Sequence, residues 1–586
     1  MSTSPEAKLV ALEGADEDRF GSSVSLDGDT AVVGAPFDNA DTLDGHSDRG
    51  SAYVFLRDGA SWSQQAKLTA SDANGGDRFG GSVAVDGDTL VVGASGNDDA
   101  AAAAGAAYVF ERTGTTWTET QILVAADGAG GALAGFGSTV DIDGNTIVIG
   151  ARGAAAVYVF ARIGPVWLQQ AKLTSAHPEP NDLFPYKVAV DGDTIVAGAP
   201  QHDGAGGTNS GAVIVFVRNA ASWSQQAELH GSVAEPHDWV GVSVALDGDT
   251  IAAGSIASIA PSPKPGSVYV FARRGTIWTE EARLMASDAL PPDAFGISVA
   301  LDGERLLVGA FTDQLGPSSN VGAAYLFLRQ GTRWSEEDKL TAPDMASGDS
   351  FGQSVAIDGV RILAGAGGDD IDTEGDVGSA HVFSLRDVIT FEGLPAGTVV
   401  AEVFGQGTLG PIEVFALNPA FGLGTNAAVV FDSASPTGAD PDLGTPNETC
   451  AKPGPGQGLG GEAGSPFENC AALGKLLIVA EDLVDANGDG LVDDPDDADL
   501  VGSGFLFDFT ALGEVSLCGL TILDVEDDRP PPRVFLFGEG GLFFSAVLPA
   551  TGDNGVAVLD VPCVPGVRSM IVQMNGSGAI DNIVFR

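Results

Sequence analysis

Apolar and polar residues alternate over short runs that recur through the first 385 residues. Each copy reads approximately F-G-x-S-V-x-x-D-G-D-T-x-V-V-G-A-P, followed by A-Y-V-F and then by W-x-x-x-x-K-L. A tandem repeat of this length indicates a repeat fold. The seven Phe-Gly openings, or their equivalents, begin at Phe20, Phe79, Phe136, Phe184, Val240, Phe295 and Phe351.

Within one copy the pattern is that of β-strands. Two short β-branched runs flank Asp27-Gly28-Asp29, which is a strong signal for a tight hairpin. A third strand is predicted around Tyr53, and a fourth from Trp62 to Leu68. Four antiparallel strands per repeat predict the blade of a β-propeller.

The seventh copy lacks its last strand, because no Trp and no K-L follow Phe383. Ala7-Lys8-Leu9 near the start of the chain matches that strand and has no hairpin before it. We therefore predict an all-β protein in which residues 1–386 form a seven-bladed propeller closed by the N-terminal strand, since closure leaves no long exposed edge. A linear stack of β units is the alternative.

These motifs resemble the FG-GAP repeats of the integrin α-subunit head and of many bacterial extracellular proteins. The resemblance covers about two thirds of the chain and rests on pairs such as Phe20-Gly21 with Gly34-Ala35-Pro36. It implies a propeller and an exported protein. Integrin-type repeats that bind calcium carry a longer D-x-[DN]-x-[DN]-G loop, whereas Asp27-Gly28-Asp29 is too short to surround Ca²⁺ with six or more oxygens. We therefore expect no calcium in the blades.

The second part of the chain, residues 387–586, departs from the repeat. Strand-like runs separated by Gly/Pro-rich segments predict a β-sandwich that is jelly-roll-like. Its four cysteines contain no C-x-x-C, so two disulfides are expected in an exported domain. Of the three possible connectivities we favour Cys450 with Cys470 and Cys518 with Cys563, and free buried cysteines are the alternative.

A candidate calcium loop lies in this second domain, between residues 485 and 496. Its oxygen donors alternate as in an EF-hand loop, with glycine at position 6 for the sharp turn. Position 12 is an aspartate instead of the longer glutamate, and the loop resembles the isolated calcium loops of dockerins. The predicted Ca²⁺ ligands are Asp485, Asn487, Asp489, the carbonyl of Leu491, Asp493 and Asp496. A resemblance to jelly-roll carbohydrate-binding modules implies a weaker second site between Glu392 and Asp581.

Eighty acidic against 28 basic residues give a formal net charge of −52. Nucleic acid and anionic membranes are excluded as partners, because both require clustered Lys and Arg. No run of 18 apolar residues is present, so no membrane span is predicted. We expect an extracellular or cell-surface protein whose signal peptide was removed before residue 1.

No hydrolase G-x-S-x-G or zincin H-E-x-x-H is present, and the six histidines are scattered along the chain. The repeated Tyr and Trp are expected to pack between blades. Aspartates in the loops 37–49 and 368–376 suggest one acidic patch across the closure, with a solvated rim as the alternative.

Taken together, these patterns favour a non-catalytic recognition or adhesion protein that binds a glycan or a protein and is stabilised by calcium. A structural subunit of a surface layer or filament, formed by self-assembly, is one alternative. Accessory binding domains of a polysaccharide-degrading system are another.

Overall fold

The computed structural model describes residues 2–389 except for several loops, and shorter stretches beyond them. The undescribed loops are 40–47, 59–60, 99–103, 128–134, 180, 205, 221, 257–263, 292, 315–319 and 372–374. The described stretches of the second part are 402–403, 412–417, 428–432, 475–479, 504–512, 515–523, 533–538, 540–548, 556–573 and 579–585. The chain divides into two compact units, the first spanning Thr3–Ser384 and the second beginning at Leu385.

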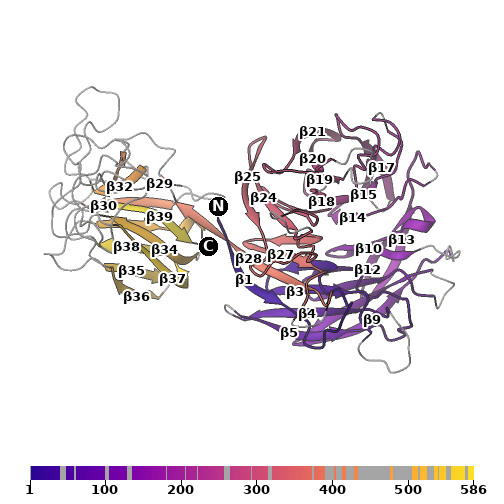
Figure 1. Cartoon of the computed structure of the whole chain (residues 1–586), viewed down its shortest axis with the longest axis horizontal. Helices are drawn as coiled ribbons and strands as arrows, with labels where there is room; N and C mark the ends of the chain where they lie inside the picture. Colours follow the sequence, from indigo (N-terminus) through magenta and orange to yellow (C-terminus); the bar gives the residue numbers. More distant parts are fainter. Residues whose placement is uncertain are drawn as a thin grey trace. The chain divides into compact units, whose positions relative to one another are not determined.

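The first unit consists of seven blades, and Figure 1 shows them following one another around a ring. Six blades are separate four-stranded antiparallel sheets, and the four strands of the seventh belong to a larger sheet. The strands of blades one to three are β2 (Ser23–Asp27), β3 (Thr30–Ala35), β4 (Ser51–Asp58), β5 (Ser61–Leu68), β6 (Ser82–Asp86), β7 (Thr89–Ala94), β8 (Ala106–Thr113), β9 (Thr116–Leu123), β10 (Phe136–Asp143), β11 (Thr146–Ala151), β12 (Ala156–Ile163) and β13 (Val166–Leu173), with the short 3-10 helix η1 (Arg152–Ala154) after β11. Those of blades four to six are β14 (Val188–Asp191), β15 (Thr194–Ala199), β16 (Ala212–Asn219), β17 (Ser222–Leu229), β18 (Ser243–Asp247), β19 (Thr250–Ser255), β20 (Ser267–Arg274), β21 (Ile277–Leu284), β22 (Ser298–Asp302), β23 (Arg305–Ala310), β24 (Ala323–Gln330) and β25 (Arg333–Leu340). Blade seven contains β26 (Ser354–Asp358), β27 (Arg361–Ala366), β28 (Ser379–Ile389) and β1 (Ser2–Leu9).

The N-terminal strand completes blade seven, as the sequence predicts. β1 pairs with β28. Thr3 donates two hydrogen bonds to Asp338 on the outer strand of blade six, at 2.9 and 2.6 Å. Lys8 reaches Asp344 and Asp369 at 2.6 and 2.7 Å. The two ends of the repeat region are therefore held in one sheet.

The Asp-Gly-Asp turns connect neighbouring blades. Gly28 has φ +54°, a conformation that glycine adopts readily, and it lies between the paired residues Asp27 and Thr30. The carboxylate of Asp27 accepts a hydrogen bond from the backbone N–H of Gly87, one blade further on, at 2.7 Å. The same contact recurs from Asp86, Asp143, Asp191 and Asp247 to the turn glycine of the next blade, at 2.5–2.7 Å. The first aspartate of each turn thus has a structural role between blades.

The two glycine motifs are required by close approach between blades. A Cβ added to Gly34 would lie 2.0 Å from the carbonyl oxygen of Gly80, so the G-A-P of one blade touches the F-G of the next. Phe20 is fully buried and packs edge-to-face against Tyr53 and Phe55, with ring centroids 5.4 and 5.9 Å apart. The tyrosines of the repeat are therefore core residues, as predicted.

A central channel of about 280 Å³ is lined by the innermost strand of each blade, namely β2, β6, β10, β14, β18, β22 and β26. Asp141 and Lys187 are charged residues of this lining. Most of the other lining residues are uncharged, namely Val, Ala, Ser, Leu, Ile and Thr. The channel is thus narrow and mostly uncharged.

The described parts of the second unit form two antiparallel sheets. One has the order β29-β30-β33-β38-β35-β36, and in the other β39 pairs with β28, β32 and β34. Buried residues of both sheets form one hydrophobic cluster, which includes Phe505, Leu536, Leu517 and Ile583. The strands are β29 (Glu402–Val403), β30 (Ile412–Leu417), β31 (Ala428–Asp432), β32 (Lys475–Val479), β33 (Gly504–Asp508), β34 (Val515–Leu523), β35 (Arg533–Gly538), β36 (Gly541–Val547), β37 (Val556–Val567), β38 (Ser569–Gln573) and β39 (Ala579–Phe585), with the 3-10 helix η3 (Thr510–Leu512). Two sheets around one core agree with a sandwich, while the jelly-roll connectivity remains a prediction.

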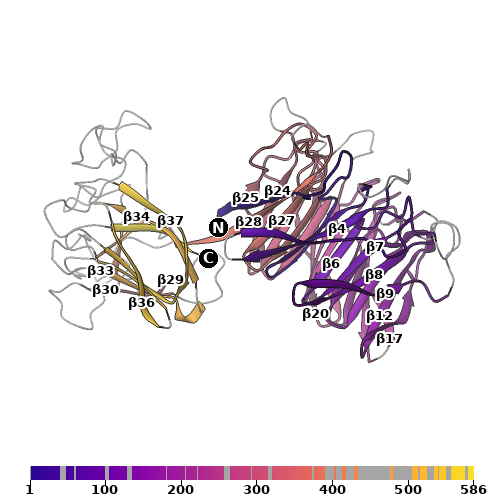
Figure 2. The same cartoon turned by 90° about the horizontal axis from the view of Figure 1, so that it is seen from below.

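A disulfide joins Cys518 to Cys563, as one of the two predicted pairings requires. It ties β34 to β37. Residues 385–388, at the boundary between the two units, are part of a strand. They belong to β28, the strand labelled in Figure 2, and Asp387–Ile389 of β28 pair with Phe585–Ile583 of β39.

Candidate ligand-binding face

Most of the metal sites predicted from sequence fall outside the described residues. The undescribed ligands are those of the calcium loop, Asp485, Asn487, Asp489, Leu491, Asp493 and Asp496, together with Glu392 of the weaker site. The predicted disulfide between Cys450 and Cys470 also lies outside the described residues. The backbone of Asp581 lies in β39, opposite Thr521 of β34. These assignments stay predictions.

The two faces of the propeller are built differently. The turn face carries the Asp-Gly-Asp hairpins. On the opposite side, here called the loop face, the segment between the second and third strands of a blade lies against the segment that leads into the next blade. In blade one, Arg78 and Phe79 donate backbone hydrogen bonds to Asp48 and Arg49, at 3.0 and 2.9 Å. Because these segments differ most among the repeats, the loop face is where recognition is expected.

A cavity of about 870 Å³ opens on the loop face between blades two and four. Its walls come from the segment after β7, from η1, and from the segment after β13. The lining residues are Arg78, Ser95, Gly135, Ser138, Arg152, Gly153, Ala155, Ser175, Pro178, Glu179, Asn181, Asp182, Leu183 and Phe184. Its size and its few convergent polar groups are typical of a ligand site.

Arg152 is the distinctive residue of this cavity. It follows Gly150-Ala151, at the position where blade one has Pro36. Its guanidinium carbon lies 4.2 Å from the ring centroid of Tyr186, a cation–π contact. Its Nε is buried and has no hydrogen-bond partner among the described residues. Burial lowers the pKa of Arg152, and the nearby Tyr186 opposes this shift.

Blade four departs from the F-G-x-S-V consensus and reads Phe184-Pro185-Tyr186-Lys187-Val188. Tyr186 thereby supports Arg152, and Lys187 takes the position of the usual serine. Burial lowers the pKa of Lys187, and the positive charge of Arg152 lowers it further. The charge of Arg152 thus reaches Lys187, which lines the central channel and not this cavity.

The opposite wall of the cavity carries two acids, of which Asp182 is structural. Asp182 accepts a hydrogen bond from the backbone N–H of Glu179 at 2.8 Å. The equivalent aspartates of five other repeats accept the same bond from the residue three positions earlier, at 2.5–2.8 Å: Asp18, Asp77, Asp238, Asp293 and Asp349. Glu179 is exposed, and its Oε2 accepts a hydrogen bond from the backbone N–H of Asp203 at 3.2 Å, so its other oxygen is the acceptor that a ligand can reach.

Lysine–aspartate pairs recur at the rim of the loop face. In blade one, Lys67 lies 3.1 Å from Asp38, which also accepts a hydrogen bond from Tyr53 Oη at 2.6 Å. In blade six, Lys339 contacts Asp288 and Asp313 at 2.6 and 3.0 Å. Asp38 and Asp369 are both buried in such pairs. The acidic patch suggested for the loops 37–49 and 368–376 is therefore wrong for these two aspartates.

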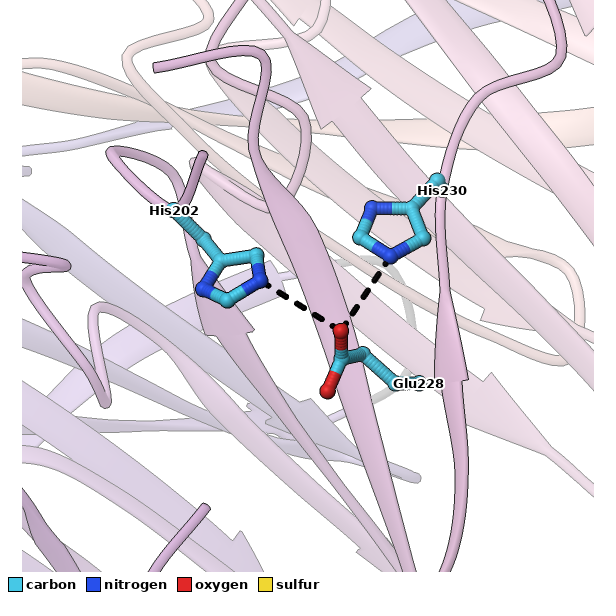
Figure 3. A group of neighbouring side chains, drawn as sticks. All are labelled: His202, Glu228 and His230. Carbon is cyan, nitrogen blue, oxygen red and sulfur yellow. Dashed lines mark hydrogen bonds and ion pairs between the residues drawn. The ribbon is translucent and has the colours of Figure 1, made fainter. Parts of the chain in front are cut away.

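In blade four, a glutamate and a histidine replace this lysine–aspartate pair. Glu228 takes the place of the lysine, His202 that of Asp38, and Ile214 that of the tyrosine. His177 Nδ1 lies 3.0 Å from Glu228 Oε2, and the Nε2 atoms of His202 and His230 each lie 3.3 Å from Glu228 Oε1 (Figure 3). Burial would raise the pKa of Glu228, but the hydrogen bond with His177 and the charges of the neighbouring histidines lower it.

Three of the six histidines thus meet at one carboxylate, which corrects the expectation that they are scattered. Comparing the repeats position by position shows the exchange of Lys for Glu at 228, and that signal was available in the sequence. The consensus sequence does not show this exchange, because it gives the commonest residue at each position and blade four differs from it.

The fold defines a β-propeller protein, and its loop face has a cavity lined in part by polar side chains. The FG-GAP repeat model matches seven segments, residues 3–55, 62–110, 117–160, 167–216, 223–271, 278–327 and 334–383. Since they cover more than half of the chain, the protein belongs to the FG-GAP repeat family. A search of curated proteins finds no similar sequence. Among the described residues, no helix has the length and apolar character needed to cross a membrane.

Proposed function

We propose that this protein is a non-catalytic, extracellular recognition protein whose propeller binds a carboxylate-bearing glycan in the cavity beside Arg152. The observation that carries the proposal is the guanidinium of Arg152, stacked on Tyr186, with its buried Nε unpartnered. A planar guanidinium can hold a carboxylate through two parallel hydrogen bonds.

The charge of the chain limits the ligand. With 80 acidic and 28 basic residues, the protein repels a polyanion over a distance of about 8 Å at physiological salt. A ligand with a single carboxylate, such as a terminal sugar acid, avoids most of that repulsion. The serines and Asn181 of the cavity supply partners for sugar hydroxyls, and Glu179 accepts from them.

Export is supported by the disulfide between Cys518 and Cys563, since disulfides persist in oxidising compartments. For calcium, the support is the donor spacing of residues 485–496. We assign the ion a stabilising role in the second unit. The carboxylate-binding cavity, in contrast, belongs to the propeller.

The test is a glycan array that contains neutral and carboxylated glycans, probed with the intact protein in calcium and in excess chelator. We expect saturable binding to a carboxylated glycan that is weakened at least about 10-fold by Arg152→Ala, the loss of one charge-assisted contact. Arg274→Ala, at an exposed arginine at the end of β20, is the matched control and should bind as the wild type does.

Equal binding by Arg152→Ala and the wild type would overturn the site, and no binding to any glycan would overturn the ligand class. In the second case a protein ligand or the structural alternative gains weight. Calcium-dependent growth of particles in light scattering would then identify self-assembly.

A further inference from the structure

Glu228 and the two histidines beside it in blade four have the donor set and the spacing of a transition-metal site. We propose that His202, Glu228 and His230 bind a divalent zinc-class ion on the loop face of the propeller. This site is distinct from the calcium loop predicted in the second unit, and it does not depend on the ligand assigned to the cavity beside Arg152.

The distances between the donors carry the proposal. The Nε2 atoms of His202 and His230 each lie 3.3 Å from Glu228 Oε1, and one donor atom from each of the three residues lies within 4.8 Å of the other two. Two donors about 2.0–2.1 Å from a tetrahedral zinc ion are about 3.3 Å apart. An ion can therefore enter between them with little movement of the side chains (Figure 3).

The outer nitrogens of both imidazoles are positioned as metal-binding histidines require. His202 Nδ1 lies 3.3 Å from the buried Asp182 Oδ2, and His230 Nδ1 lies 3.2 Å from the carbonyl oxygen of Gly211. Each contact favours the tautomer that protonates Nδ1 and leaves the Nε2 lone pair for the metal. Glu228 Oε2 is oriented in turn by His177 Nδ1 at 3.0 Å. The support around the three donors is thus already in place.

The fold explains how the three side chains converge. Glu228 and His230 are two residues apart at the end of β17, so their side chains leave the same face of the strand. His202 follows β15 in the loop that returns to β16. The side chains are 6%, 18% and 29% exposed for His202, Glu228 and His230, so water can supply the fourth ligand of a tetrahedral ion.

Two other groups of potential ligands in the described residues are weaker. In blade seven, Asp344, Asp369 and His381 also cluster, but the ammonium of Lys8 contacts both carboxylates at 2.6 and 2.7 Å. A cation of the chain itself thus occupies that place. The group Glu179, Asp182 and His202 offers one imidazole, and Asp182 is committed to the backbone of Glu179. Among the three groups found in the described residues, the triad around Glu228 is the one that combines two imidazoles with a carboxylate and has no lysine contact given for it.

The experiment is a zinc titration of the chelator-treated full chain by calorimetry, in about 0.15 M NaCl to screen the surface acids, with calcium present to saturate the predicted loop. We expect one zinc ion to bind per chain, with a dissociation constant of micromolar or lower. His230→Ala and Glu228→Gln should each weaken that binding by more than about 100-fold, since the loss of even a supporting contact costs 10- to 100-fold. His237→Ala changes a histidine of the same face outside the triad and serves as the control.

Cobalt provides an independent measurement. Co²⁺ should give the visible absorption of a tetrahedral ion in the wild type and in His237→Ala, and lose it in both triad variants. Thermal unfolding shows whether each variant is folded. The proposal is overturned if wild-type protein binds no stoichiometric zinc, or if folded His230→Ala and Glu228→Gln bind it as tightly as the wild type.

Discussion

The backbone N–H of Gly28 in blade one donates a hydrogen bond to the carboxylate of Asp358 in blade seven, at 2.5 Å and across 330 residues of sequence. Arg361 of blade seven adds a bond to the carbonyl of Gly28 at 3.0 Å. Together with the pairing of β1 and β28, these contacts join the last blade to the first. The stability of the first unit therefore depends on both ends of the repeat region.

Removal of residues 1–9 tests this dependence. Without β1, the outer edge of β28 in blade seven loses its partner, and Asp338, Asp344 and Asp369 lose their contacts with Thr3 and Lys8. We expect the thermal unfolding temperature of the propeller to fall by more than about 10 °C, because a strand edge is exposed and the buried Asp369 loses the ammonium of Lys8 at the same time.

A synthetic peptide of residues 1–12 should restore the unfolding temperature when added in trans, and a chain that lacks only residues 1–2 is the control. Unchanged unfolding of the chain without residues 1–9 would show that closure does not need β1.

Gly80→Ala tests the contact between blades. At Gly80 φ is +87°, and an added Cβ would lie 2.2 Å from the backbone oxygen of Ser51. We expect a loss of about 3 kcal/mol or more in the free energy of unfolding, since a strained backbone and a clash with main chain are combined. Gly81→Ala is the matched control: its Cβ would meet the oxygen of Arg78 at 3.3 Å, and denaturant unfolding should show a change below about 1 kcal/mol.

Asp141→Asn tests the charge in the central channel. Burial raises the pKa of Asp141 from 3.8 to about 7, although hydrogen bonds from the backbone of Val190 and Ile142 oppose the shift. As pH rises above 3.8 the unfolded chain ionises first, so the wild type loses stability until about pH 7. Asparagine keeps an acceptor for Val190 and carries no charge.

The variant should therefore match the wild type at about pH 4 and be more stable by about 1–2 kcal/mol at about pH 8, a value reduced for solvent in the channel. Urea unfolding at the two pH values measures this difference. Asp58→Asn, at an exposed acid at the end of β4, should show no such dependence. A variant that is less stable than the wild type at both pH values would contradict the assignment.

The disulfide of the second unit offers an independent prediction. Cys518 and Cys563 are 45 residues apart, and a cross-link of that span stabilises by about 4 kcal/mol in the chain-entropy description. Replacing both cysteines by serine should lower the unfolding transition of the second unit and leave that of the propeller unchanged. Calorimetry resolves the two transitions, and a shift of the propeller transition instead would contradict the division at Leu385.

Much of the fold follows from local patterns that repeat. The Asp-Gly-Asp turns, the aromatic third strand and the missing strand supplied by Lys8 could be read from the sequence, because each depends on residues that lie close together or recur seven times. Arg152 and His202 could not be assigned in this way. The role of Arg152 depends on Tyr186 of the neighbouring blade, and that of His202 on its approach to Glu228 within blade four. Both residues occur where one repeat departs from the consensus.

Exchange of the charges in blade four provides the final test of that departure. Glu228→Lys alone places an ammonium beside His177, His202 and His230, and His202→Asp alone places a second carboxylate near Asp182 and Glu228. Each single change should destabilise the propeller by about 1–2 kcal/mol, because a partly buried charge loses its partner.

The double variant reproduces in blade four the arrangement of Lys67 and Asp38 in blade one, which are 3.1 Å apart. Its stability should return to within about 1 kcal/mol of the wild type, so that a double-mutant cycle by urea unfolding gives a favourable coupling of at least about 1 kcal/mol. Additive losses would mean that residues 202 and 228 do not form the pair found in blades one, six and seven, and the geometric basis of the metal site would fall with it.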